Sequence, residues 1–174
     1  GRVYWLKVHR IPDVGPDGRG KSIANLVAMA PDEKIAALET VKDFPQKKGE
    51  CFVVMGTRTG VVKKTDLLAF RNPRAGGIIA MGVNGDDEVV GAELTDGQRQ
   101  IFIGTRNGKA IRFPGSAVRP MGRVAAGVRG IRLRKGDEVV AMAVVRPGGT
   151  LLSVTENGYG KRTQIEEYRV QSRG

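Results

Sequence analysis

The chain has 174 residues and carries 29 Lys plus Arg against 18 Asp plus Glu, a formal net charge of +11. Its 40% of hydrophobic residues are too many for a disordered basic tail, and a single cysteine, Cys51, excludes an internal disulfide and a thiolate zinc site. No apolar run approaches the roughly 20 residues of a membrane-spanning helix, and the N-terminus has no signal-peptide pattern. The composition predicts a folded, soluble chain in a reducing cytoplasm, with nucleic acid or another anionic surface as its leading class of partner.

The first 50 residues read as an incomplete copy of a unit that recurs later in the chain. Residues 1–4 predict the turn and second strand of a hairpin whose first strand is missing. Residues 33–39 favour a helix by propensity, but their alignment with the later copies predicts a strand.

Residues 15–22 fit the pattern G-x-x-x-x-G-K-[ST], which cradles phosphate in nucleotide-binding enzymes. Such a P-loop must lie between a buried strand and a helix whose N-terminus receives the phosphate. Here alternating basic residues precede the segment and Pro31 follows it, so we expect an extended loop between strands. Arg19 and Lys21 in this loop are candidates for contact with DNA.

Three stretches share an apolar alternating run, a tight turn and a basic strand: residues 51–64, 101–112 and 151–162. Their turn glycines, Gly60, Gly108 and Gly158, are 48 and 50 residues apart. Asn precedes glycine in the last two, a pair that favours a hairpin turn because only Gly and Asn adopt positive φ readily. Each repeat is therefore expected to open with a β-hairpin.

A second landmark has the same period, because Asp-Glu-Val-Val at residues 87–90 recurs at residues 137–140. Its recurrence favours a turn role for these carboxylates over a metal site. Further β-rich segments predict a third and a fourth strand, near residues 77–81 and 127–131, and near residues 89–94 and 139–144. Four strands in about 50 residues are typical of propeller-like blades. We predict one all-β domain with a truncated blade, two whole blades and a half blade: residues 1–50, 51–98, 99–149 and 150–174.

Each hairpin has a basic residue four positions after its glycine, namely Lys64, Arg112 and Arg162. Side chains on a strand alternate between faces, so these three are expected to point the same way from successive blades. Charge reversal at each is expected to weaken duplex binding without unfolding the chain.

A rim of Lys and Arg neutralises successive phosphates of a bent duplex without reading its bases. Aromatic residues are only 5% of the chain, which disfavours the stacking platforms of single-strand binders. The candidate residues for binding duplex DNA are Lys7, Arg19, Lys21, Arg58, Lys63, Lys64, Arg71, Arg74, Arg106, Lys109, Arg112, Arg119, Arg123, Arg129, Lys161 and Arg162.

Two strings carry a resemblance to a known family. Residues 157–163, Asn-Gly-Tyr-Gly-Lys-Arg-Thr, and residues 121–133, which include Gly-Val-Arg-Gly-Ile-Arg-Leu, resemble the C-terminal domain of the bacterial DNA gyrase A subunit. The resemblance implies a β-pinwheel, a propeller-like disc whose blades exchange strands and whose basic rim wraps duplex DNA. The family's hallmark heptapeptide, a Gln followed by basic residues and paired glycines, has no match here. The first blade is therefore expected to lie upstream of Gly1.

The resemblance also implies what lies outside this chain. The complete enzyme is a type II topoisomerase that introduces negative supercoils and uses ATP and Mg²⁺ elsewhere, so no cofactor or metal is expected here. The implied partners are double-stranded DNA and, in a heterotetramer, the gyrase B subunit together with the remainder of the gyrase A subunit. The implied location is the bacterial cytoplasm at the nucleoid, without membrane contact. The catalytic tyrosine belongs to another domain, so this chain alone is not expected to be an enzyme.

Three other interpretations stay open. The C-terminal domain of topoisomerase IV shares the architecture with a more degenerate pattern. A propeller that binds an acidic protein or an anionic membrane would keep acidic protein partners when DNA is absent. A P-loop nucleotide enzyme would need ATP binding that Lys21→Ala abolishes. Other catalytic chemistry has little support, because His9 is the only histidine and Cys51 begins an apolar strand.

Overall fold

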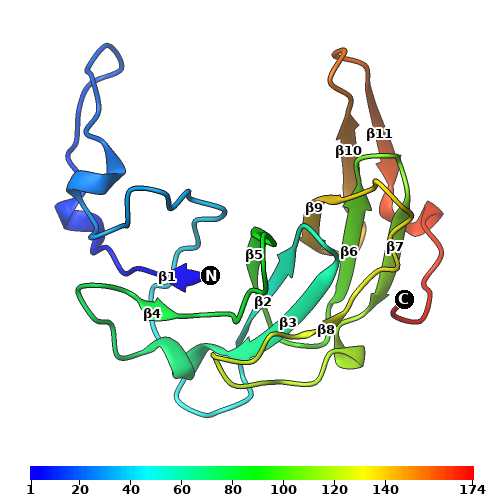
Figure 1. Ribbon diagram of the computed structural model, residues 1–174, viewed down its shortest axis with the longest axis horizontal. Coiled ribbons are helices and arrows are strands. Elements are labelled where there is room, and N and C mark those ends of the chain that lie inside the picture. Colours follow the sequence, from blue (N-terminus) through cyan, green and yellow to red (C-terminus); the bar gives the residue numbers. More distant parts are fainter.

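The computed structural model describes residues 1–174 and forms a crescent of antiparallel strands joined by loops (Figure 1). The strands are β1 (Arg2–Val3), β2 (Phe52–Thr57), β3 (Val61–Asp66), β4 (Ile78–Ile79), β5 (Val89–Thr95), β6 (Gln100–Thr105), β7 (Ala110–Pro114), β8 (Val128–Arg129), β9 (Val139–Val144), β10 (Thr150–Val154) and β11 (Gly160–Gln164). The short 3₁₀ helices are η1 (Val8–Arg10), η2 (Ile23–Asn25), η3 (Leu67–Phe70), η4 (Gly115–Ala117) and η5 (Ile165–Glu167). There is no α-helix, and the predicted all-β fold is confirmed.

Three antiparallel hairpins, β2–β3, β6–β7 and β10–β11, lie where the repeated pattern predicts them. Their turn glycines Gly60, Gly108 and Gly158 have φ angles of +88°, +76° and +82°. Glycine adopts this left-handed region without the steric cost that a Cβ atom brings. The turn chemistry therefore sets where each hairpin reverses.

The recurring Asp-Glu landmark has the turn role that its period predicts. The Asp87 carboxylate accepts hydrogen bonds from the Thr59 amide at 2.9 Å and the Thr59 hydroxyl at 2.5 Å, and Asp137 accepts one from the Asn107 amide at 3.1 Å. Burial opposes ionisation of Asp87, but hydrogen bonds from Thr57, Thr59 and the backbone together hold its pKa below the ordinary value. These carboxylates fasten the end of each repeat to the turn of its own hairpin.

The third strand of each repeat completes the sheet of the preceding repeat. β8 pairs with β3, and β4 pairs with β1 in the same relative register. The Gly60 carbonyl accepts a hydrogen bond from the Gly130 amide at 2.8 Å, and the Gly1 carbonyl accepts one from the Ala80 amide at 3.0 Å. β1 thus takes the place that β3 takes in the next hairpin, as predicted. The strand exchange implied by the family resemblance is present.

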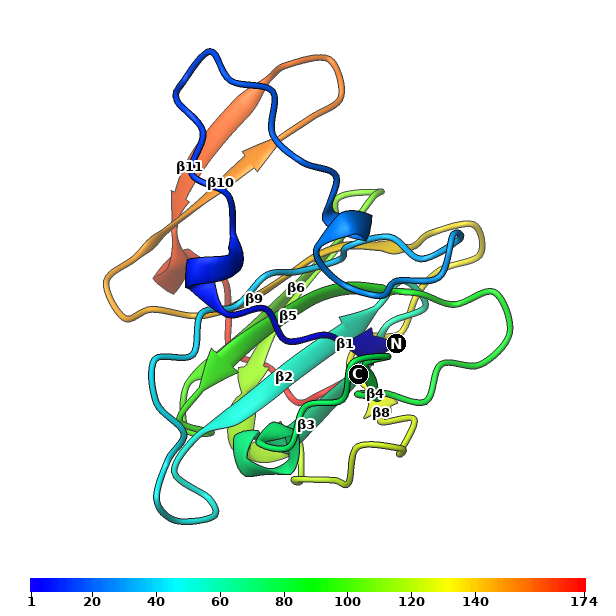
Figure 2. The same ribbon diagram turned by 90° about the vertical axis from the view of Figure 1, so that its left-hand side faces the viewer.

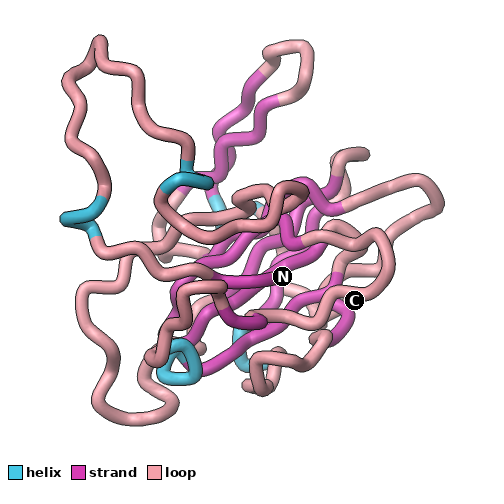
Figure 3. Tube along the Cα trace, turned by 60° about the vertical axis from the view of Figure 1, so that its left-hand side comes forward, coloured by secondary structure: helices cyan, strands magenta, loops and turns pink.

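The fourth strands, β5 and β9, pair with the first strands of their own hairpins, β2 and β6. Figure 2 shows β2, β5, β6 and β9 side by side. The strand predicted over residues 33–39 is wrong, because this segment lies in the long loop between η2 and β2 (Figure 3). A strand needs a neighbour that shares its backbone hydrogen bonds. β5 has such a neighbour in β2, but no strand pairs with residues 33–39.

The largest core cluster joins two repeats rather than filling one blade. Val54 and Val62 of the β2–β3 hairpin pack with Ile103 and Phe113 of the β6–β7 hairpin and with Ile131, and each of these side chains is at most 2% exposed. Burying an aliphatic or aromatic side chain contributes about 1.5–3 kcal/mol. Neighbouring repeats therefore stabilise one another and hold the crescent together.

The second strand of each of the first two complete hairpins sends a cationic side chain into the next repeat. Lys64 Nζ donates to the Gly115 carbonyl at 2.7 Å, and Arg112 Nη1 donates to the Ile165 carbonyl at 2.8 Å. Lys64 is 4% exposed and Arg112 is half-buried. The expectation that both present their charge to solvent is wrong, because this strand face is covered by the following repeat. Charge reversal at either residue is expected to break the junction between repeats.

Lys63 is also interior, contrary to its prediction as a DNA contact. Its side chain is 0% exposed, and Nζ donates to the Ala80 carbonyl at 2.6 Å and to the Arg123 carbonyl. Burial lowers the pKa of Lys63 to about 8, and the Arg123 guanidinium adds to this effect. A neutral amine still has two N–H donors, enough for both carbonyls. Lys63 therefore holds two loops together.

Gly60→Ala is expected to destabilise the chain more than Gly108→Ala. Both positions have positive φ, which costs about 1–2 kcal/mol for alanine. At Gly60 the added Cβ would also lie 2.9 Å from the Ile131 carbonyl oxygen of the next repeat, whereas at Gly108 nothing lies within 4 Å. This overlap adds about 1–3 kcal/mol. Urea unfolding of both variants measures the difference, and equal losses of stability would contradict close packing at this junction.

The free energy of unfolding is expected to rise between about pH 8 and pH 10.5. In this range the folded chain holds Lys63 neutral while the unfolded chain still protonates it, so raising the pH favours the folded state. Lys63 contributes at most about 3–4 kcal/mol to this rise, at about 1.36 kcal/mol per pH unit. Lys63→Met, measured by urea unfolding across the same range, should lack most of it. An identical pH profile for both chains would show that Lys63 stays charged in the fold.

Candidate nucleic-acid interface

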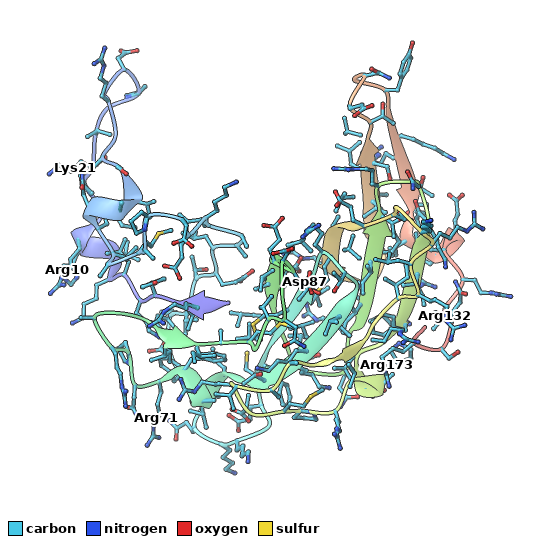
Figure 4. All side chains as sticks on the ribbon, viewed as in Figure 1. Arg10, Lys21, Arg71, Asp87, Arg132 and Arg173 are labelled. Atoms are coloured by element: carbon cyan, nitrogen blue, oxygen red, sulfur yellow. The ribbon has the colours of Figure 1, made fainter.

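The outer, convex side of the crescent carries an arginine at one repeated position. The short helices η3, η4 and η5 lie along this side (Figure 1). Arg71, Arg119 and Arg169 follow them, each eleven residues after a hairpin glycine. All three side chains are exposed and none forms an ion pair, and Figure 4 places Arg71 on the outer edge. We call these three residues the rim arginines.

Arg169 is a rim residue that the sequence reasoning missed. The prediction followed the position four residues after each glycine and took Arg71 and Arg119 only as neighbouring charges. The signal that identifies Arg169 is its spacing of eleven residues from Gly158, which matches that of Arg71 and Arg119 from their own glycines.

Further arginines extend the positive charge of the convex side. Figure 4 places Arg132 and Arg173 near β7 and β8, and both residues are exposed. The Arg173 guanidinium donates to the Arg129 carbonyl at 2.7 Å, which ties the C-terminal segment to β8. Arg74, Arg123 and Arg129 were all predicted to contact DNA. Arg74 and Arg129 are exposed, as such a contact requires, whereas Arg123 is half-buried.

On the inner side of the crescent, in contrast, two arginines are paired with carboxylates. Arg58 lies 3.5 Å from Glu88 and 3.7 Å from Glu138, and Arg106 lies 2.6 Å from Glu138. Figure 4 places Asp87, which binds the adjacent hairpin turn, inside the crescent. Arg58 and Arg106 were predicted as part of a free basic rim, and the structure places them in ion pairs instead. Glu138 joins two repeats through these pairs.

The predicted candidates in the N-terminal segment lie on a projecting loop. Lys7, Arg19 and Lys21 are exposed, and Lys21 lies on the arm at the left of Figure 4. The P-loop-like residues 15–22 are followed by η2, a 3₁₀ helix of three residues, and not by an α-helix. The helix N-terminus that would receive a phosphate is therefore missing, and this segment is a loop, as expected.

Three candidates remain on the hairpins. Lys109 is exposed, and its Nζ donates to the Arg132 carbonyl at 2.8 Å. Lys161 and Arg162 are exposed on β11. Thus the rim arginines, Arg74 and Arg129 are exposed on turns and strand edges. Lys63, Lys64 and Arg112 instead lie in the junctions between repeats.

Three further features concern the aromatic rings, the possible metal ligands and the helices. Trp5 packs against Phe44 with ring centroids 5.4 Å apart, and Phe102 packs against Tyr168 at 5.0 Å, so these rings are not laid out as a stacking platform. No three His, Cys, Asp or Glu side chains are grouped so that they could hold a metal ion. None of the helices has the length and apolar character needed to cross a membrane.

Comparison with known proteins places the chain in a family. The family model described as "DNA gyrase C-terminal domain, beta-propeller" matches residues 1–42, 52–96, 99–146 and 149–174. The DNA gyrase A subunit of Streptomyces coelicolor is 42% identical over 181 residues, covering 100% of this chain and 21% of that protein. The DNA gyrase A subunit of Salmonella typhimurium is 43% identical over 173 residues, covering 99% of this chain and 19% of that protein.

Two solved structures share the fold along the whole chain. The C-terminal domain of DNA topoisomerase IV matches with a TM-score of 0.88 and 31% identity, covering 100% of this chain and 54% of that one. The DNA gyrase A C-terminal domain matches with a TM-score of 0.84 and 26% identity, covering 100% of this chain and 55% of that one. The chain spans about a fifth of the length of its curated relatives. From the family match and these relatives, the chain belongs to the DNA gyrase C-terminal domain family.

Proposed function

We propose that this chain binds double-stranded DNA along its convex side and bends the duplex around it, as the C-terminal domain of the DNA gyrase A subunit. The observation that carries the proposal is the set of rim arginines, Arg71, Arg119 and Arg169, which are exposed, unpaired and repeated with the blades. A duplex that follows the curve of the crescent meets one such cation per repeat.

Binding of this kind is electrostatic and independent of base sequence. Arginine forms paired, charge-assisted hydrogen bonds with phosphate oxygens, and each neutralised phosphate releases counterions into solution. The rim arginines lie on turns after short 3₁₀ helices, and no α-helix is present to enter a major groove. Phosphate contacts position a duplex but carry no direct sequence information.

In the whole protein, this binding would wrap DNA and direct strand passage toward negative supercoiling. The similarity to DNA gyrase A subunits supports this assignment. The complete enzyme would be a heterotetramer of gyrase A and gyrase B chains in the bacterial cytoplasm at the nucleoid, using ATP and Mg²⁺ outside this chain. The catalytic tyrosine would also lie elsewhere, leaving this chain a DNA-binding module without a cofactor of its own.

The C-terminal domain of topoisomerase IV is the second candidate, because a solved domain of that name matches with a TM-score of 0.88. Identities of 42% and 43% with DNA gyrase A subunits along the whole chain favour the gyrase assignment. Both candidates use the same convex side to bind duplex DNA in our proposal, so the experiment below tests what they share.

Arg71→Gln, Arg119→Gln and Arg169→Gln should each weaken binding to two unrelated duplexes by the same factor. Each should also reduce the slope of log affinity against log salt concentration by about 0.9, because one phosphate contact is lost. Fluorescence anisotropy over a range of salt concentrations measures both quantities. Arg106→Gln is the matched control, since it removes one exposed charge from the inner side and should leave the slope unchanged.

Two results would contradict the proposal. A loss of affinity confined to one of the two duplexes would mean that these arginines read bases rather than phosphates. Salt-independent or absent duplex binding, together with retention of an acidic protein partner, would favour the interpretation of the basic surface as a protein-binding one.

A further inference from the structure

Gly1 precedes β1 as Gly60 precedes β3, and the residue four positions after Gly1, Gly60 and Gly108 has the same task. Trp5 Nε1 donates to the Phe70 carbonyl at 3.0 Å, Lys64 Nζ to the Gly115 carbonyl at 2.7 Å and Arg112 Nη1 to the Ile165 carbonyl at 2.8 Å. Each acceptor lies in the 3₁₀ helix η3, η4 or η5 of the following repeat. Indole, ammonium and guanidinium groups share only an N–H donor at the end of a long side chain. What these three side chains have in common is therefore the donated hydrogen bond; Lys64 Nζ in addition lies over the Phe52 ring, 5.2 Å from its centroid.

The backbone of the same residues reinforces the junction. The Lys64 carbonyl accepts a hydrogen bond from the Met121 amide at 2.8 Å, and the Arg112 carbonyl accepts one from the Gln171 amide at 2.7 Å. Lys64 and Arg112 each form an isolated parallel bridge with the segment after the next 3₁₀ helix. Side chain and backbone together fix the following repeat to the hairpin edge.

Arg162 occupies the same position in the last hairpin, but its side chain is exposed and no bond or ion pair of its guanidinium is formed. Its cross-strand neighbour Leu152 is 65% exposed, whereas the corresponding neighbours Val54 and Phe102 are 0% and 4% exposed. Val154 on the same hairpin is also 64% exposed. The β10–β11 hairpin thus has an exposed apolar face and a side-chain donor without a partner. In the two earlier hairpins the following repeat covers this face.

We propose that Arg162 is the donor of a further junction between repeats and not a phosphate ligand. Its guanidinium would donate to a backbone carbonyl in the 3₁₀ helix of one more β-repeat supplied by the same polypeptide, and Leu152 and Val154 would be buried beneath that repeat. The two solved domains leave room for this occupant, since the present chain covers only 54% and 55% of their lengths. Arg162 is then a positioning residue that sets where the next rim arginine lies.

The test uses the full-length protein with Arg162→Met, Arg162→Lys and Arg169→Met. Arg162→Met keeps a long apolar side chain but removes the donor, so hydrogen–deuterium exchange of residues 150–164 should accelerate about tenfold or more. Arg162→Lys should remain within about threefold of the parent rate, because Lys64 performs the same task in an earlier repeat. Arg169→Met, the matched loss of an exposed arginine, should not accelerate exchange.

Duplex binding of the same variants separates this proposal from the proposed function. Only this binding measurement rests on the proposed function; the exchange measurement does not. Arg162→Met should keep the parent salt slope, whereas Arg169→Met should reduce it by about 0.9. Parent-like exchange in Arg162→Met, or a salt slope reduced as in Arg169→Met, would overturn the junction role. A parent-like slope in Arg169→Met with fast exchange in Arg162→Met would refute the rim and leave the junction intact.

Discussion

The constraint on which this structure depends is the hydrogen-bonding demand of the hairpin edges. Unpaired backbone N–H and C=O groups are costly when buried, so each edge must find a partner. In this chain the partner of β3 is β8, a short strand that belongs to the following repeat. No repeat is complete by itself, and the fused core of Val54, Val62, Ile103, Phe113 and Ile131 follows from that exchange. Curvature and spacing of the rim are consequences of how one repeat docks on the next.

The excess of positive charge divides between two positions in the repeat. Four residues after the hairpin glycine the strand still faces the neighbouring repeat, and Lys64 and Arg112 end on backbone carbonyls. Eleven residues after it the chain has passed the 3₁₀ helix and faces solvent, so Arg71 and Arg119 remain free. The inner side neutralises its arginines with glutamates such as Glu138. The convex side therefore keeps unpaired arginines at a repeated position, in a chain whose net charge is +11.

Local turn chemistry and period made much of the fold predictable from sequence. Gly60, Gly108 and Gly158 marked the hairpins, and the recurring Asp-Glu pair marked the turn contacts. Nothing local signals which face of a strand another repeat will cover, so alternation correctly grouped Lys64 with Arg112 but placed both in solvent. The prediction of a strand over residues 33–39 was wrong for a related reason, because a strand forms only with a hydrogen-bonded neighbour and not from its own residues alone. Arg169 was within reach of the sequence and was missed because only one repeated basic position was followed.

Paired photo-crosslinking can show whether a duplex lies along the convex side and meets the repeats in order. A photoreactive phenylalanine analogue is placed at positions 71 and 119, or at 71 and 169, of the full-length protein in complex with a duplex. We predict that both sites crosslink to the same duplex, with a constant number of base pairs between the two adducts. That number should be larger for 71 with 169 than for 71 with 119. Variable separations, or stronger crosslinking from inner-side position 107, would contradict a duplex path along the rim arginines.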